Sequence, residues 1–204
     1  MSASSAPPES HLVTAQPPHV LIVVSSTRPG RNGPAIARWV ETELAARTDV
    51  RATIADLAEI GLPLLDEPNH PSDRNYVHDH TRRWSRMVAS ADAFVFALPE
   101  YNRSMPGSLM NALDFLYWEW QRKPAGFVSY SGGAFGGVRS VEMTKQVLST
   151  LGMFPLPEMV NVPHIDEHMR DGDFIAPERA AAALSSMTDT LLAYAAATRQ
   201  LRAA

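Results

Sequence analysis

The chain has 204 residues, is 45% hydrophobic, carries a net charge of −4 and contains 0 cysteines. The missing cysteines exclude disulfides, thiolate nucleophiles and cysteine-ligated zinc or iron–sulfur centres. The mildly acidic balance with scattered cations excludes a basic surface for nucleic acid. No apolar run approaches the roughly 20 residues that a membrane span needs, so a soluble, cytoplasmic protein is expected.

The first 18 residues differ in composition from the rest of the chain. They are rich in Ser, Ala and Pro, and they lack the basic and apolar segments of a signal peptide. We therefore predict a disordered N-terminal tail over residues 1–18 and one domain over residues 19–204.

Short apolar runs alternate with helical periodicity along the first half of the domain. Val20–Val24 is a β-branched run typical of a strand buried on both faces. Gly33-Pro34 then opens a helix, and Arg51–Leu57 is a second strand. A proline-rich loop follows, then a helix around residues 77–88, and a third buried strand at Ala93–Leu98.

The second half continues the alternation. A helix is expected from about Pro106 to Tyr117, and a fourth strand over Gly126–Tyr130. A helix follows around residues 141–151, then a short fifth strand near Glu158–Val162 and a last helix over Ala180–Leu201. Alternating strands and helices imply a parallel sheet with helices on both faces, which binds ligands at the carboxyl ends of its strands.

The loop after the first strand, Ser25 to Gly33, has the chemistry of a phosphate site. It offers hydroxyls, backbone amides and arginines, and it leads into a helix N-terminus. It is neither Gly-x-Gly-x-x-Gly nor a Walker A motif, so a phosphate monoester suits it better than a pyrophosphate. A polar turn with no ligand is the alternative interpretation of this loop alone.

The loops after the third and fourth strands would complete the same mouth. Pro99 to Gly107 holds an aromatic and an amide between prolines, which suits the edge of a flat heteroaromatic ring. Ser131-Gly132-Gly133 follows the fourth strand, and its paired glycines permit close backbone approach and positive φ. A rigid turn and a flexible turn are the respective alternatives, so the prediction rests on the three loops together.

Four segments carry a resemblance to a known family. They are Ser-Ser-Thr-Arg at residues 25–28, Pro-Glu-Tyr-Asn at 99–102, Pro-Gly-Ser-Leu-Met-Asn-Ala-Leu-Asp at 106–114, and Ser-Gly-Gly with Gly-Gly-Val-Arg within 131–139. In these the chain resembles the NADPH-dependent FMN reductases, a flavodoxin-like group that includes quinone, azo-dye and chromate reductases. Relatives often carry a serine near Arg31, and a lysine where this chain has Met110.

The resemblance implies a flavodoxin-like three-layer α/β sandwich with a five-stranded parallel sheet in the order 2-1-3-4-5. It implies one bound FMN, with NADPH or NADH as co-substrate. The cofactor-binding residues that it implies are Ser26, Thr27, Arg28, Asn32 and Gly33 for the phosphate, Pro99, Glu100, Tyr101 and Asn102 along the ring, and Ser131, Gly132 and Gly133 beside the ring and ribityl chain. Arg139, Arg28 and Arg31 are candidates for the ribose phosphate of NADPH.

The expected function is an oxidoreductase that passes hydride from NAD(P)H through FMN to a quinone, azo compound, metal oxyanion or free flavin. No catalytic side chain is required, because the cofactor carries the chemistry. A non-catalytic flavodoxin-like electron carrier and a flavin-free interaction module are the alternatives. Relatives form homodimers or homotetramers, and Leu109–Trp120, apolar on more than one face, is the expected contact; packing on the domain's own sheet is the alternative.

Two histidine pairs invite a metal interpretation. His164 and His168 have a metal-ligand spacing, but Pro163 and the loop composition argue against a helix there. His78 and His80 are two apart, so on their helix they are expected to face different ways. No metal site is predicted.

Overall fold

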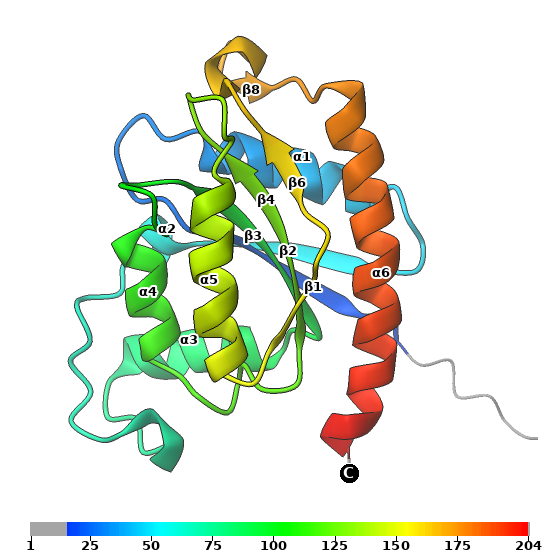
Figure 1. The fold of residues 1–204 in the computed structure, drawn as a ribbon. Helices are drawn as coiled ribbons and strands as arrows, with labels where there is room; N and C mark the ends of the chain where they lie inside the picture. The colour runs from blue at the N-terminus through cyan, green and yellow to red at the C-terminus, as the bar shows by residue number, and fades with distance from the viewer. Residues whose placement is uncertain (1–15, 204) are drawn as a thin grey trace, which may run out of the picture.

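The computed structural model describes residues 16–203, and most of the predicted 1–18 tail lies outside them. One parallel sheet forms the middle of the molecule, with helices on both of its faces (Figure 1). Its strands follow the predicted order β2-β1-β3-β4-β5, and a sixth strand, β6, also pairs with β4. They are β1 His19–Val24, β2 Arg51–Asp56, β3 Ala93–Pro99, β4 Pro124–Tyr130, β5 Phe154–Pro155 and β6 Val160–Val162.

The fifth position of the sheet is divided between two short strands. Pro124 and Ala125 at the start of β4 pair with β5, whereas Val128, Ser129 and Tyr130 at its end pair with β6. The sequence predicts a single strand here, near 158–162, and therefore finds only β6. Two residues of β5, at the sheet's edge and with two prolines close by, carry too little pattern to be recognised.

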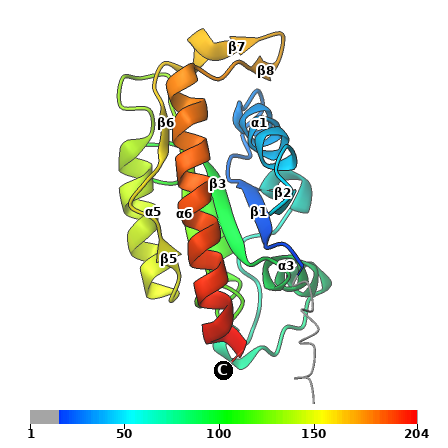
Figure 2. The ribbon, with the colours of Figure 1, turned by 90° about the vertical axis from the view of Figure 1, so that its right-hand side faces the viewer.

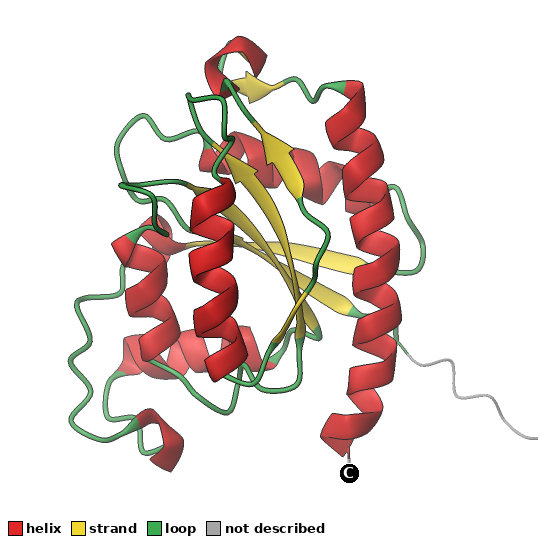
Figure 3. Ribbon diagram, viewed as in Figure 1, coloured by secondary structure: helices red, strands yellow, loops and turns green. Residues whose placement is uncertain are grey.

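The central strands of the sheet send alternate side chains to two separate cores. On one face, Val20, Ile22 and Val24 pack with α1 (Gly33–Ala45) and α6 (Glu178–Ala203). On the other, Leu21 and Val23 pack with α3 (Asp79–Ala89), α4 (Gly107–Asp114) and α5 (Val138–Thr150). Figure 3 shows the strands enclosed by these helices. Central strands apolar on both faces are what a sheet covered on both sides requires.

Two smaller pieces sit beside the carboxyl edge of the sheet. A four-residue helix, α2 (Leu57–Ile60), directly follows β2. After β6 the chain forms a 3-10 turn, η2 (Ile165–His168), and a hairpin of β7 (Met169–Arg170) and β8 (Asp173–Phe174) before α6 begins. Figure 2 shows this hairpin at the same end of the molecule as the start of α6.

The helix expected to run from Pro106 to Tyr117 is shorter than predicted. α4 ends at Asp114, and residues 115–122 form turns. Leu109, Leu113, Leu116 and Trp120 are all buried in the chain's own core. The apolar pattern of Leu109–Trp120 is therefore explained by packing within one domain, and it does not require a contact with a second copy.

The prediction that His78 and His80 face different ways is wrong. Their rings stack with centroids 5.1 Å apart and an interplanar angle of 10°. His78 is the residue before α3 and has an extended backbone, so the helical spacing rule does not apply to it. Asp66 lies against both, with His80 Nε2 3.0 Å from one carboxylate oxygen.

Within residues 16–203, no helix combines the length and the apolar character that crossing a membrane would require.

Candidate functional site

The loops after β1, β3 and β4 meet at the carboxyl edge of the sheet, as the strand order requires. They enclose a cavity of about 310 Å³ together with η2. Its lining is Arg28, Arg31, Asn32, Pro99, Glu100, Tyr101, Tyr130, Ser131, Gly132, Ile165 and Asp166.

The first two residues of the β1 loop are buried and support it from below. The Ser25 hydroxyl donates to the Ala97 carbonyl of β3, and the Ser108 hydroxyl of α4 donates to the Ser25 carbonyl. The Tyr130 hydroxyl donates to Ser26 Oγ at 3.3 Å. Burial raises the pKa of Tyr130, so its phenol stays protonated and able to donate. Ser26 thus lies beneath the loop, where its hydroxyl already has a partner.

Arg31 fixes the shape of the same loop. One of its guanidinium nitrogens is 2.8 Å from both carboxylate oxygens of Asp56 and 3.1 Å from the Ser26 carbonyl. Asp56, at the end of β2, also accepts from the Ala58 amide of α2 at 3.0 Å. The side chains of Arg31 and Asp56 are both mostly buried, which strengthens the charge-assisted hydrogen bonds between them. Arg31 therefore joins the loop to β2.

The N-terminus of α1 opens toward the cavity. Asn32 precedes the helix and lines the cavity, but no side chain caps the first-turn amides. Gly33 begins the helix and is buried; a Cβ there would lie 2.6 Å from Ser26 Oγ and 2.9 Å from the Tyr130 hydroxyl. Uncapped amides and the positive end of the helix dipole favour an anion at this point.

The β3 loop forms a tight hairpin at the mouth of the cavity. Tyr101 and Ser104 exchange two backbone hydrogen bonds, with Tyr101 N–H donating at 3.0 Å and Ser104 N–H at 2.9 Å. Between them, Asn102 and Arg103 have φ of 52° and 65°, the signature of a two-residue turn with both central residues left-handed. Asn tolerates this conformation, which accounts for an amide residue at the tip.

Glu100 connects the β3 loop to the β4 loop. Its carboxylate is 3.0 Å from Arg139 Nη1 and accepts from the Arg139 amide at 3.2 Å, in the first turn of α5. The Arg139 guanidinium also lies 4.0 Å above the exposed ring of Phe135. An acidic group at a helix N-terminus is stabilised by the helix dipole. Glu100 therefore holds two walls of the cavity together.

The glycines of the β4 loop divide their roles differently from the prediction. Positive φ occurs at Gly136 and Gly137, whereas Gly132 and Gly133 adopt none. A Cβ at Gly137 would lie 3.0 Å from the Tyr130 backbone, so this turn packs tightly on β4. A Cβ added at Gly132 would have Asp166 Oδ2, 3.6 Å away, as its nearest neighbour, so there is room for a side chain. The first glycine pair is open, and the second makes the turn.

The structure gathers seven of the twelve predicted cofactor-binding residues into the cavity lining: Arg28, Asn32, Pro99, Glu100, Tyr101, Ser131 and Gly132. Ser26 and Gly33 are buried below it. Thr27 lines a neighbouring hollow with Ser108 and Asn111, while Asn102 and Gly133 are exposed at the rim.

Three lining residues escaped the sequence prediction. Tyr130 is the last residue of β4, next to the predicted Ser131, so its position in the strand was the available signal. Ile165 and Asp166 come from η2, which is brought in by backbone bonds: the Ile165 amide donates to the Ser131 carbonyl at 3.0 Å. Nothing in their local sequence distinguishes them.

Four charged residues line the site, and they differ in whether they have an ion-pair partner. Arg31 is paired with Asp56, and Glu100 is paired with Arg139. Within the described part of the chain, Arg28 and Asp166 line the cavity without an ion-pair partner. A free guanidinium beside uncapped helix amides fits a phosphate, and a wall that includes Pro99 and Tyr101 fits an aromatic ring. The residues present thus fit a ring-bearing phosphate monoester such as FMN.

Comparison with known proteins agrees with this geometry. Residues 18–167 match the model of the NADPH-dependent FMN reductase family. The chain is 38% identical over 144 residues to an NAD(P)H-dependent FMN reductase of Schizosaccharomyces pombe, covering 70% of this chain and 71% of that protein. It is 34% identical over 140 residues to a quinone reductase of Pseudomonas putida, covering 66% and 71%.

The fold likeness extends to solved structures. The NAD(P)H:acceptor oxidoreductase FerB of Paracoccus denitrificans superposes with a TM-score of 0.70 at 22% identity, covering 89% of this chain and 98% of that one. This likeness shows a flavodoxin-like α/β fold with the strand order found here. With the family match over residues 18–167, the chain is an oxidoreductase of the NADPH-dependent FMN reductase family.

Proposed function

We propose that the carboxyl-edge cavity holds one FMN and that the protein uses NAD(P)H to reduce a small acceptor, a quinone being the first candidate. The single observation that carries the proposal is the uncapped N-terminus of α1 beside the unpaired Arg28. The similarity to a quinone reductase supports the choice of acceptor. The free flavin, azo compounds and metal oxyanions belong to the same acceptor panel.

The phosphate would bind where donors are free. Arg28 supplies charge, and the backbone amides at the start of α1 supply directed hydrogen bonds. Thr27 adds a hydroxyl at the exposed tip of the loop. Ser26, Arg31 and Gly33 would not touch the phosphate themselves. Their contacts are with other protein groups, and they fix the shape of the loop.

The ring would lie against the Pro99–Tyr101 and Ser131–Gly132 walls. Pro99 and Tyr101 supply its apolar side, and the backbone of the open glycines allows close approach. When bound, FMN supplies the two-electron redox chemistry. The walls orient the ring, restrict water and present backbone amides near its edge. The role of Arg139 changes: because Glu100 and Phe135 hold it, it can meet a NADPH phosphate only by sharing its guanidinium.

The first test measures FMN affinity with Arg28→Ala and a matched control. We expect Arg28→Ala to weaken FMN binding at least tenfold, because a charge-assisted phosphate contact is lost. Arg38→Ala removes an exposed arginine of α1 that pairs with Asp173, and it should leave the affinity unchanged. Flavin fluorescence quenching gives both dissociation constants. Equal affinities in the wild type and Arg28→Ala would move the phosphate elsewhere.

The second test measures turnover. FMN-loaded protein should oxidise NADPH or NADH catalytically when a quinone is present. Oxidation that stops after one equivalent would instead indicate an electron carrier. A protein that stays colourless after incubation with FMN and desalting would indicate a flavin-free module.

A homodimer or homotetramer, expected from the family resemblance, stays part of this proposal. Its contact would use exposed apolar residues beside the site, of which Leu64 is 85% and Leu65 46% exposed, in place of the buried α4 side chains. Light scattering at micromolar concentration tests it: a monomer would contradict the assembly.

A further inference from the structure

A second cavity lies at the opposite, amino edge of the sheet and is lined by cations. Its volume is about 410 Å³, and its lining includes Arg74, Trp118, Arg122, Lys123 and Arg202. Lys123 directly precedes β4, whereas Ser131 of the cofactor site directly follows it. The seven residues of this strand separate the two cavities by roughly 20 Å. The second cavity is therefore a separate site.

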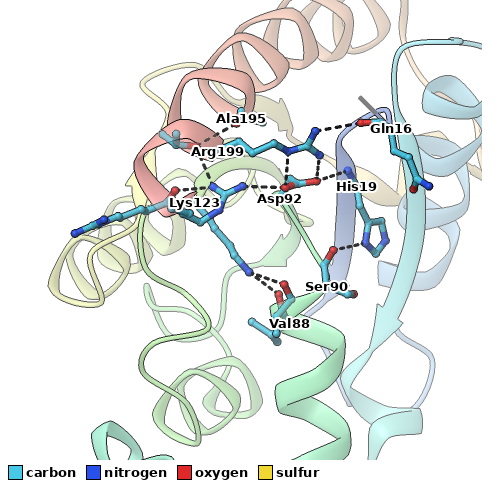
Figure 4. Close-up of polar contacts among 12 residues, drawn as sticks. Gln16, His19, Val88, Ser90, Asp92, Lys123, Ala195 and Arg199 are labelled. Carbon is cyan, nitrogen blue, oxygen red and sulfur yellow. Dashed lines mark hydrogen bonds and ion pairs between the residues drawn. The ribbon is translucent and has the colours of Figure 1, made fainter. Parts of the chain in front are cut away.

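Lys123 forms the floor of this cavity and is only 5% exposed. Its ammonium donates to the carbonyls of Val88 at 2.8 Å and Ala89 at 3.2 Å, which end α3 (Figure 4). Among the described residues, no carboxylate lies within 4.0 Å of it. The Phe94 ring centroid lies 5.7 Å from the same ammonium, so its contacts are two carbonyls and an aromatic face, none of which carries a full negative charge. Burial is the main cause that lowers the pKa of Lys123 to about 8, and the nearby charge of Arg202 contributes to the same shift.

The neighbouring carboxylates Asp92 and Glu119 favour this charge from a distance, but both are already engaged by other donors. Asp92 already accepts from Arg199 and, at 2.8 Å, from Arg202, and Figure 4 shows it facing Arg199 and His19. Glu119, buried in the cavity wall, accepts from the hydroxyls of Tyr76 and Ser85. Two carboxylates thus face five cations around this corner, in a chain whose net charge is −4.

The rim of the cavity is formed by two arginines and an exposed tryptophan ring. Arg122 uses one nitrogen to donate to the Leu201 carbonyl, which leaves its other donors free. The Arg74 guanidinium lies 5.7 Å from the ring centroid of Trp118, which is 44% exposed. Arginine stacks well on aromatic faces and pairs bidentately with phosphate.

We propose that this amino-edge cavity binds a small organic phosphate that carries a flat aromatic ring. The phosphate would lie between Lys123 and Arg122 and balance their charge. The ring would stack beside Trp118, under the Arg74 guanidinium. A dianion suits the surplus of cations better than a carboxylate does.

Titration calorimetry on the full-length, FMN-saturated protein tests the proposal, with adenosine 5′-monophosphate as the probe. FMN saturation blocks the carboxyl-edge phosphate loop. Adenosine and inorganic phosphate are the two partial probes, for ring and anion. We expect the monophosphate to bind more tightly than inorganic phosphate, and adenosine to show no binding. Equal affinity for adenosine and its monophosphate, or no heat with the monophosphate at millimolar concentration, would overturn the proposal.

Variants locate the binding. Arg74→Ala/Arg122→Ala removes two exposed side chains, so the fold should be preserved, and affinity for the probe should fall at least tenfold. Arg86→Ala, an exposed arginine of α3 outside the cavity lining, is the matched control and should bind as the wild type does. Full affinity in the double variant, or loss in Arg28→Ala at the other edge, would contradict this location. The readout needs no NAD(P)H oxidation, so it is independent of the proposed enzyme activity.

Discussion

The cavity at the carboxyl edge of the sheet and the Asp92 cluster at its amino edge use their polar groups in opposite ways. At the carboxyl edge, Arg28 and the first amides of α1 are left without protein partners, around a cavity. At the amino edge, Asp92 accepts from the His19 amide, from Arg199 and from Arg202, which ties β1 and α6 to the turn before β3. The first arrangement leaves donors for a ligand, and the second consumes them within the fold.

The contrast teaches where binding capacity and stability reside. Donors that have no partner lower stability unless water or a ligand meets them, so a site must be supported from beneath. Arg31–Asp56 and Tyr130–Ser26 give that support at the carboxyl edge. At the amino edge, Lys123 meets two carbonyls and an aromatic ring, and Arg122 retains free donors, beside the saturated Asp92 cluster. Substitutions at one edge can therefore be made without touching the other.

The largest expected effect comes from Asp92→Ala. It leaves Arg202, largely buried, without a counter-ion, and it should lower the free energy of unfolding by about 3 kcal/mol. Although burial alone raises the pKa of Asp92, hydrogen bonds from Arg199 and the His19 amide hold it below its usual value. This stabilisation is therefore complete above about pH 4 and is lost as the pH falls through the folded-state pKa.

Urea unfolding at pH 7 and pH 3 measures this difference. The wild-type advantage over Asp92→Ala should shrink at the lower pH. Asp173→Ala, which removes an exposed partner of Arg38, is the control and should cost less than about 1 kcal/mol. FMN affinity should survive Asp92→Ala, since the cluster lies at the other edge; a large loss of affinity would join the two edges.

Gly33→Ala tests the packing beneath the cavity at the carboxyl edge. The new methyl would lie 2.8 Å from a Val24 methyl and 2.6 Å from Ser26 Oγ, so the loop or β1 must shift. Overpacking of this kind costs about 2 kcal/mol, and the displaced loop should also bind FMN more weakly. Unfolding and flavin titration measure both. Gly107→Ala has no atom within 4 Å of the added Cβ and should change stability by less than about 0.5 kcal/mol; equal costs would refute the packing argument.

Lys123→Met tests the buried ammonium through its pH dependence. A lysine pKa lowered to about 8 means that folding disfavours the charged form. The penalty is complete below about pH 8, and wild-type stability should recover by about 1–2 kcal/mol as the pH rises toward 10. Lys123→Met should lack this rise. Lys145→Met, at a lysine of α5 that pairs with Glu142, should retain it.

The smallest effect is expected from Glu100→Gln. Neutralising the carboxylate weakens its bonds to the Arg139 side chain and amide, at a cost of about 1 kcal/mol. The β3 and β4 walls should separate slightly, and FMN affinity should fall a few-fold. Glu142→Gln, an exposed partner of Lys145 on the same helix, should leave FMN affinity unchanged. Equal effects of the two changes would remove Glu100 from the site.

Much of the fold could be predicted because burial leaves a local pattern. Runs such as Val20–Val24 and Ala93–Leu98 identify buried strands, and the polar loops that follow them predict the edge at which a ligand would bind. The end of α4 could not be predicted in this way. Phe115, Leu116 and Trp120 are buried in turns, and an apolar residue in a packed turn looks the same in sequence as one in a helix.

The sequence by itself was enough to predict the alternating α/β fold, a candidate phosphate site in the β1 loop and a candidate wall for a ring. These predictions depend only on the residue types that lie in the strands and directly after them. Only the tertiary structure decided which donors stay free. Asp56 lies 25 residues from Arg31, and Asp166 lies far along the chain from Arg28. Arg31 is paired with Asp56 and is not free to bind a ligand, whereas Arg28 has no ion-pair partner among residues 16–203. These pairings depend on distances in space, which the order of residues along the chain does not reveal.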